Sequence, residues 1–148
     1  MKVVFMGTPE FSVPILRALV ENGYEVAGVF TQPDKPKNRG HKLMFSPVKQ
    51  YAVEQGLTVY QPLKMKDGTA LATVRELNPE LIVVAAYGRI LPEDILNTPK
   101  YGSINVHSSL PPQRRHGEIR RPHKNNAHIL SILRCSFLPL SASVRTSR

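Results

Sequence analysis

Short apolar runs alternate with amphipathic stretches over the first 112 residues of this chain. Runs rich in β-branched and aromatic residues predict strands. The five predicted strands are Lys2–Met6, Glu25–Thr31, Leu57–Tyr60, Leu81–Tyr87 and Ser103–His107. The fourth run is apolar throughout, as expected of a strand that is buried on both faces of a parallel sheet.

Helices are predicted between these strands. The first has apolar residues at helical spacing from Val13 to Val20 and ends at Asn22-Gly23, a typical C-cap. In the second, Ser46 is the expected N-cap and Pro47 the first helical residue, and the helix runs to Gln55. Two more are predicted at Thr69–Leu77 and Pro92–Leu96. Alternating strands and helices predict an α/β fold with a doubly wound, mostly parallel sheet.

The pattern breaks after Pro112. Residues 113–128 are basic without an apolar period, and residues 129–140 are apolar without a helix or strand period. We therefore predict one domain over residues 1–112 and a divergent, poorly ordered tail over residues 113–148. Within the domain, Gln32–Phe45 is predicted to be a loop, which is long for a connection between strand and helix.

The net charge of +9 suggests a nucleic-acid partner, but its distribution weakens that argument. Residues 113–148 hold eight Lys and Arg against one acid, Glu118, so the first 112 residues carry only +2. A single cysteine, Cys135, excludes an internal disulfide and a zinc site of paired cysteines. The tail histidines His116, His123 and His128 match no familiar zinc spacing, so no metal is expected.

Composition indicates the cellular location. No apolar run reaches the roughly 20 residues that span a bilayer, and the first residues lack the long apolar segment of a secretory signal. With a single cysteine, a reducing compartment is the default. We expect a cytoplasmic monomer with no membrane partner.

Ligands of open parallel sheets bind beyond the carboxyl ends of the strands, where three features of this chain are expected to meet. The turn Gly7-Thr8-Pro9 has a single glycine and is not a dinucleotide fingerprint, which argues against a nicotinamide or flavin enzyme. The basic loop Asp34–Lys42 could contact nucleic-acid phosphates or be a solvated loop.

The third feature is Asn105 and His107, which point to one face if they lie on a strand. An amide N–H can stabilise the oxyanion of an acyl-type transfer. An imidazole can move a proton near neutral pH. The alternative is two polar residues that are hydrogen-bonded at a strand edge.

Several segments of the chain form a characteristic set when they are taken together. They are Val4-Phe5-Met6-Gly7-Thr8-Pro9-Glu10-Phe11, Thr31-Gln32-Pro33-Asp34-Lys35-Pro36, Arg39-Gly40, Lys42-Leu43, Ser46-Pro47-Val48-Lys49, Asn78-Pro79-Glu80-Leu81-Ile82-Val83-Val84-Ala85-Ala86-Tyr87-Gly88, Ile90-Leu91-Pro92 and Gly102-Ser103-Ile104-Asn105-Val106-His107 with Ser109-Leu110. Together these segments resemble the methionyl-tRNA formyltransferase family. The resemblance covers about residues 1–112. The last segment alone is similar to the wider group of folate-dependent formyltransferases.

The resemblance implies transfer of a formyl group from 10-formyltetrahydrofolate, without a metal, to the amino group of methionyl initiator tRNA. It implies that Asn105 holds the formyl oxygen and that His107 assists proton transfer at the folate nitrogen. It implies that Arg39 and Lys42 engage the tRNA. The folate-binding segment that it implies is Ser109, Leu110, Pro111 and Pro112.

The chain departs from the family pattern at and after this segment. Pro111 stands where the resemblance implies a second leucine, and no Asp follows Asp94 to supply the aspartate that the family uses after the histidine. The carboxy-terminal domain of the family is also missing, so we expect reduced or no activity. The tail looks like the product of a shifted reading frame or a truncated gene. Two alternatives stay open: a different folate-dependent formyltransferase or hydrolase, and a non-catalytic remnant.

Overall fold

A single parallel sheet forms the centre of the computed structural model, which describes residues 1–37 and 42–106. Its strand order is β5-β2-β1-β6-β7. The strands are β1 (Lys2–Gly7), β2 (Glu25–Phe30), β5 (Val59–Tyr60), β6 (Leu81–Ala85) and β7 (Ser103–Asn105). In β1, Phe5 pairs with Val29 on one side and with Val83 on the other. The predicted α/β class and parallel sheet are confirmed.

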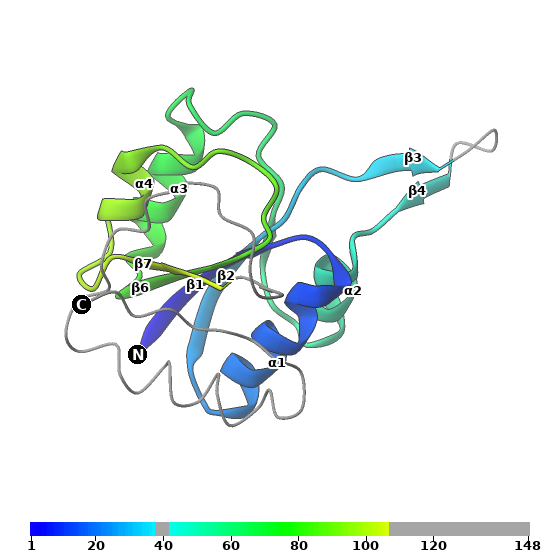
Figure 1. Cartoon of the computed structure of the whole chain (residues 1–148), viewed down its shortest axis with the longest axis horizontal. Helices are drawn as coiled ribbons and strands as arrows, with labels where there is room; N and C mark the ends of the chain where they lie inside the picture. Colours follow the sequence, from blue (N-terminus) through cyan, green and yellow to red (C-terminus); the bar gives the residue numbers. More distant parts are fainter. Residues whose placement is uncertain (38–41, 107–148) are drawn as a thin grey trace, which may run out of the picture.

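Helices cover both faces of this sheet (Figure 1). A short 3-10 helix, η1 (Glu10–Ser12), leads into α1 (Val13–Glu21), which lies with α2 (Pro47–Glu54) on one face. On the other face lie α3 (Thr69–Leu77) and α4 (Glu93–Asn97). The chain therefore winds outward from β1 through β2 to β5, and then returns to the other side of β1 for β6 and β7.

The core consists of two apolar layers, one on each side of the sheet. Alternate residues of β1 serve different layers, because successive strand side chains point to opposite faces. Val3 and Phe5 pack with α1 and α2, whereas Val4 and Met6 pack with α3 and α4. All four side chains are fully buried, which explains why β1 is apolar without alternation.

The local signals at the helix ends are confirmed. Ser46 caps α2, and its hydroxyl accepts a hydrogen bond from the Lys49 N–H at 3.1 Å. Pro14 lies in the first turn of α1, where its missing N–H costs nothing. Asn22 caps the other end of α1, and Gly23 follows with a positive φ of 77°.

The secondary structure predicted for one segment was wrong. The segment Gln32–Phe45, predicted to be a loop, contains an antiparallel pair of strands, β3 (Lys35–Lys37) and β4 (Lys42–Met44). Together these strands form an arm that projects from the body of the molecule (Figure 1). Apolar alternation is missing from the arm because it packs against no core layer, so its pattern does not indicate strands.

Other differences concern strand ends. The strand predicted to reach Tyr87 ends at Ala85, and the one predicted from Leu57 begins at Val59. The described part of the last strand ends at Asn105, and His107 lies outside the described residues. The tail over residues 113–148 also lies outside them. Within the described ranges, no helix is long and apolar enough to cross a membrane.

We predict that Val48→Ala lowers the free energy of unfolding by about 2 kcal/mol, because Val48 is fully buried between α2 and the sheet. Val53→Ala is the matched control, since Val53 lies on the same helix and is 55% exposed. It should change that free energy by less than about 0.5 kcal/mol. Urea denaturation of both variants checks this, and equal losses would contradict the packing of α2.

Candidate functional site

The carboxyl ends of the strands meet where the winding direction of the sheet reverses. That reversal lies between β1 and β6, which are paired through Gly7 and Ala85 at their last residues. Open α/β sheets bind ligands at such a switch point, because the loops that leave the two strands diverge to opposite faces. We therefore take the loops after β1, β2 and β6, together with the end of β7, as the candidate site.

The exit of β1 is tightly packed against β6. A Cβ atom on Gly7 would lie 2.8 Å from the carbonyl oxygen of Ala85, so this position has no room for a side chain. The buried Ser12 hydroxyl donates a hydrogen bond to the same Ala85 oxygen. The single glycine of the first turn therefore allows the close approach of two strands.

Tyr87 joins three loops through its carbonyl oxygen. This oxygen accepts a hydrogen bond from the Thr8 hydroxyl at 3.0 Å and another from the Gln32 side-chain amide at 3.0 Å. The same Thr8 oxygen accepts from the Gln32 N–H at 3.4 Å. The first turn and the segment after β2, which the sequence predicted to share this edge, are therefore brought together.

The loop after β6 has an unusual backbone. Ala86 has a φ of 50° and Gly88 a φ of 80°. The left-handed region costs a non-glycine residue roughly 1–2 kcal/mol, and such residues cluster at functional sites. A Cβ atom on Gly88 would lie 2.1 Å from the Gln32 amide nitrogen, so the hydrogen bond from Gln32 requires glycine there. Sequence analysis missed this loop, although Gly88 after an apolar run was a signal for it.

The Tyr87 side chain points away from the loop and into the core. It is 2% exposed, and its hydroxyl donates to the Met65 sulfur at 3.4 Å. Burial raises the pKa of the Tyr87 phenol, and the charge of Arg89 opposes this with a smaller effect. The buried Tyr87 side chain thus attaches the strained loop to the core. Its phenol is neutral near pH 7.

Two exposed apolar side chains lie on segments that Arg89 ties together. Its guanidinium donates to the carbonyl oxygens of Pro62, at 3.3 Å, and Leu63, at 2.6 Å. Leu63 is 77% exposed, and Ile90, next to Arg89, is 81% exposed. These residues follow β5 and β6, so apolar surface is available at the carboxyl edge of the sheet.

Of the predicted catalytic pair, the structure places Asn105. It is the last residue of β7, pairs with Val84 of β6 and is exposed. Ile104 and Val106 are buried in the layer of α1 and α2, so Asn105 faces the opposite side of the sheet, as Val84 does. Asn105 thus lies one strand away from the switch point, with its side chain accessible.

The other predicted site residues are not placed. His107, Arg39 and the folate-binding segment Ser109, Leu110, Pro111 and Pro112 lie outside the described residues. The backbone of Lys42 belongs to β4, but its side chain is not described. In the part of the chain that is described, no three metal-ligating side chains come together.

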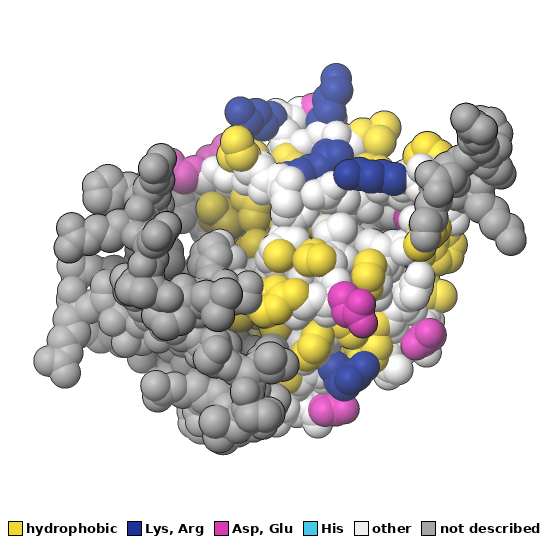
Figure 2. All heavy atoms as spheres, turned by 45° about the vertical axis from the view of Figure 1, so that its right-hand side comes forward, with side chains coloured by type: hydrophobic (Ala, Val, Ile, Leu, Met, Phe, Trp, Pro, Cys, Tyr) yellow, Lys and Arg dark blue, Asp and Glu magenta, His cyan; other side chains and the backbone are white. Residues whose placement is uncertain are grey.

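Basic residues are concentrated on one stretch of the chain. Residues 31–66 contain seven Lys and Arg against two acids, whereas the rest of residues 1–112 contains five against eight. Figure 2, which brings the side of the arm forward, shows most of its Lys and Arg side chains in the upper part of the face, whereas acidic side chains occur both there and lower down. The excess of bases along residues 31–66 favours contact of this stretch with an anionic group.

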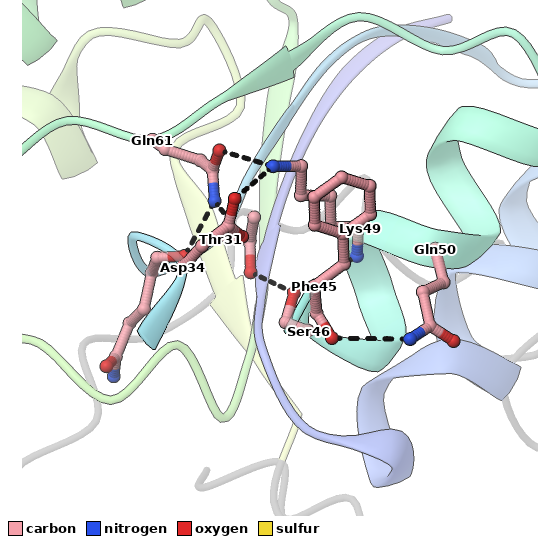
Figure 3. Close-up of polar contacts among 8 residues, drawn as sticks. Thr31, Asp34, Phe45, Ser46, Lys49, Gln50 and Gln61 are labelled. Carbon is pink, nitrogen blue, oxygen red and sulfur yellow. Dashed lines mark hydrogen bonds and ion pairs between the residues drawn. The ribbon is translucent and has the colours of Figure 1, made fainter. Parts of the chain in front are cut away.

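Asp34, directly before the arm, is held in its charged form. It forms an ion pair with Lys49 and accepts a hydrogen bond from the Gln61 amide at 2.9 Å (Figure 3). Burial by itself would raise the pKa of the Asp34 carboxyl, but the hydrogen bonds from Lys49 and Gln61 and the charge of Lys49 outweigh burial and lower this pKa. Sequence analysis missed this group, because its members are far apart along the chain.

Comparison with known proteins shows which sequences this chain is similar to. A sequence model of the family described as formyl transferase matches residues 1–121. The chain is 58% identical over 116 residues to the methionyl-tRNA formyltransferase of Caldanaerobacter subterraneus. The matched region covers 78% of this chain and 38% of that protein. It is 54% identical over 116 residues to the methionyl-tRNA formyltransferase of Bacillus subtilis strain 168, with coverage of 78% and 37%. The chain thus spans less than two fifths of these relatives.

A solved structure shares the fold. The chain superposes on glycinamide ribonucleotide transformylase 1 from Symbiobacterium toebii with a TM-score of 0.56 and 16% identity, over 76% of this chain and 53% of that one. At this identity the likeness shows the fold alone.

We predict that Ala86→Gly leaves the free energy of unfolding within about 0.5 kcal/mol of wild type. The left-handed backbone at Ala86 is relieved, and this gain offsets the greater flexibility of glycine in the unfolded chain. The control is Ala72→Gly on the exposed side of α3, which should lose about 1 kcal/mol. Chemical denaturation measures both, and equal losses would argue against the strained backbone.

We also predict a pH-dependent loss of stability that Asp34 controls. A carboxyl with a lowered folded-state pKa stabilises the fold above its unfolded pKa of about 3.9, and this stabilisation is lost as pH falls through the folded value. The difference in unfolding free energy between wild type and Asp34→Asn should therefore be largest near neutral pH and shrink below about pH 4. Urea denaturation across that range measures it, and a constant difference would contradict the lowered pKa.

Proposed function

The chain belongs to the formyl transferase family, and from that premise we propose that it acts in formyl transfer from 10-formyltetrahydrofolate to the amino group of methionyl initiator tRNA, in the cytoplasm. The observation that carries this proposal is the identity of 58% and 54% to proteins named methionyl-tRNA formyltransferase. The activity of a 148-residue chain that spans less than two fifths of those proteins is part of the proposal.

In the proposed reaction, the amine nitrogen attacks the formyl carbon and forms a new C–N bond. The carbonyl oxygen becomes an oxyanion, then the bond to the folate nitrogen breaks. One proton leaves the amine and one reaches the departing folate nitrogen. We assign the oxyanion to the Asn105 side-chain N–H, because Asn105 is exposed at the end of β7. We assign the proton transfer to His107, two residues further along.

The folate is proposed to lie along the carboxyl edge of the sheet, against Ser109, Leu110, Pro111 and Pro112. The exposed apolar side chains of Leu63 and Ile90 at the same edge support this position, because the flat ring of a folate favours apolar surface. The hydrogen bond from Gln32 to the Tyr87 carbonyl holds the loop before Ile90 in place.

The tRNA is proposed to bind on the side of the arm, with Arg39 and Lys42 at its phosphates. The charge of residues 31–66, seven bases against two acids, supports this assignment. The described arm also exposes Leu43, Met44 and Phe45, at 63%, 45% and 43%. Apolar and aromatic side chains of this kind can pack against nucleotide bases. The chain is proposed to act as a monomer.

A non-catalytic remnant is the second candidate function. The observation in its favour is that the sequence has no Asp after Asp94, whereas the resemblance implies a carboxylate in that region. A remnant could still bind folate through the carboxyl edge of the sheet. It differs from the first candidate in one measurable respect, which is turnover.

We predict that Asn105→Ala lowers kcat/KM for formylation of methionyl initiator tRNA by about 10²–10³-fold, because an oxyanion donor is lost. His107→Ala should lower it by about 10²–10⁴-fold. The control is Asn97→Ala, the same substitution at an exposed position at the end of α4, which should leave the rate unchanged. The assay follows formyl-methionyl-tRNA, with a small primary amine as a competing acceptor.

Three outcomes separate the candidates. Turnover above the His107→Ala background with the tRNA supports the proposed function. Wild-type turnover equal to that background, with folate binding detected by calorimetry, supports the remnant. Faster formylation of the small amine would instead support a formyltransferase of different specificity.

A further inference from the structure

We propose that Asp34, Lys49 and Gln61 form a clamp that sets the direction in which the arm leaves the body, and thereby the affinity of the arm for RNA. The first half of this inference rests on geometry alone. The second half rests on the proposed function, because it takes the arm as the part that contacts the tRNA.

The three side chains form a closed ring of contacts (Figure 3). Lys49 Nζ forms an ion pair with one Asp34 oxygen, and Gln61 Nε2 donates to the other at 2.9 Å. Lys49 Nζ also donates to Gln61 Oε1 at 2.9 Å, so each member contacts the other two. The Asp34 and Lys49 side chains are each only 14% exposed. A shielded ion pair whose charges are also hydrogen-bonded has a defined geometry that an exposed pair lacks.

Each member of the clamp comes from a different part of the fold. Asp34 directly precedes β3, Lys49 lies in the first turn of α2, and Gln61 directly follows β5. Gln61 Nε2 also donates to the carbonyl oxygen of Gln32 at 3.1 Å. The clamp therefore connects the start of the arm to helix α2 and to the end of strand β5.

The other end of the arm is held by the same lysine. Lys49 Nζ lies 3.8 Å from the ring centroid of Phe45, the residue that directly follows β4. Next to it, the hydroxyls of Thr31 and Ser46 are 2.7 Å apart, which joins the exit of β2 to the cap of α2. Both strands of the arm thus end on contacts that involve Lys49 or its helix.

Among the described residues, the arm has no packing against the apolar core that would compete with the clamp. None of the described residues from Lys35 to Phe45 belongs to either core layer or packs against one. The direction of a projecting hairpin without core contacts depends on what holds its base. Each strand residue advances the chain by about 3.3 Å, so three residues place the far end of β3 about 10 Å from the clamp. A rotation of about 10° at the base would move that end by nearly 2 Å, enough to break hydrogen bonds to an RNA.

The first test measures the direction of the arm. Spin labels on Leu43→Cys in β4 and Glu76→Cys in α3, with Cys135→Ser in the full 148-residue chain, report the distance between arm and body by pulsed electron paramagnetic resonance. We expect a single narrow distance distribution. Asp34→Asn, which removes the ion pair, should broaden or shift it. The matched control is Glu80→Gln, since Glu80 accepts a hydrogen bond from the Lys2 N–H at the opposite end of the sheet.

The second test measures binding of methionyl initiator tRNA to the unlabelled chain. Asp34→Asn removes one negative charge beside a basic arm, so electrostatics alone predicts tighter binding. The clamp predicts binding about tenfold weaker, because the arm is no longer held in its binding direction. Glu80→Gln makes the same charge change and should not weaken binding. Gln61→Leu leaves the charge unaltered and should act as Asp34→Asn does, which provides a second variant if Asp34→Asn does not fold.

The outcomes separate this inference from the proposed function. Unchanged distance distributions in Asp34→Asn and Gln61→Leu would overturn the clamp. A broadened distribution with tRNA affinity equal to or above wild type would overturn its link to RNA. If wild type binds no tRNA, the proposed function fails, and the distance measurement alone decides whether the clamp exists.

Discussion

The pairing of β1 with β6 at the centre of the sheet is the constraint on which the other features depend. These two strands are buried on both faces, and Gly7 lets their last residues approach so closely that any side chain at this position would overlap Ala85. Because the chain reverses its winding direction between them, the loops that follow the two strands separate and leave the carboxyl edge accessible. Core packing and the location of the candidate site therefore have the same origin.

Hydrogen bonds at this edge fix the positions of the loops that leave the sheet. The Tyr87 carbonyl gathers the loops after β1, β2 and β6, while the Tyr87 side chain is anchored in the core. This double attachment holds Ala86 in a backbone conformation that it would not adopt alone. Exposed apolar residues beyond this loop and the exposed Asn105 on β7 then lie along one edge. The hydrogen bonds of the Tyr87 carbonyl therefore connect the loops next to these groups to one another.

A different kind of interaction positions the arm than positions the rest of the molecule. Apolar burial positions the helices, whereas polar contacts around Lys49 hold the base of the arm. Polar contacts are directional, so they can fix the angle between the arm and the body without burying a large area. They also depend on the charge of Asp34, which its partners maintain. A basic projection with a defined base is suited to an extended anionic partner, and the charge distribution of residues 31–66 agrees with that.

Features that depend on near neighbours along the chain could be predicted from the amino-acid sequence: the α/β class, the helix Thr69–Leu77 and the cap at Ser46. Spacing and side-chain chemistry singled out Asn105 and His107, family resemblance implied their roles, and the structure places the first of them. Three other features depend on contacts between distant parts of the chain and became visible in the folded structure. The arm was predicted to be a loop, because strands outside the core lack apolar alternation. The strand at Leu81 ends at Ala85, because distant Thr8 and Gln32 draw the next residues away. Asp34, Lys49 and Gln61 meet across 12 to 27 positions, a separation that no local pattern records.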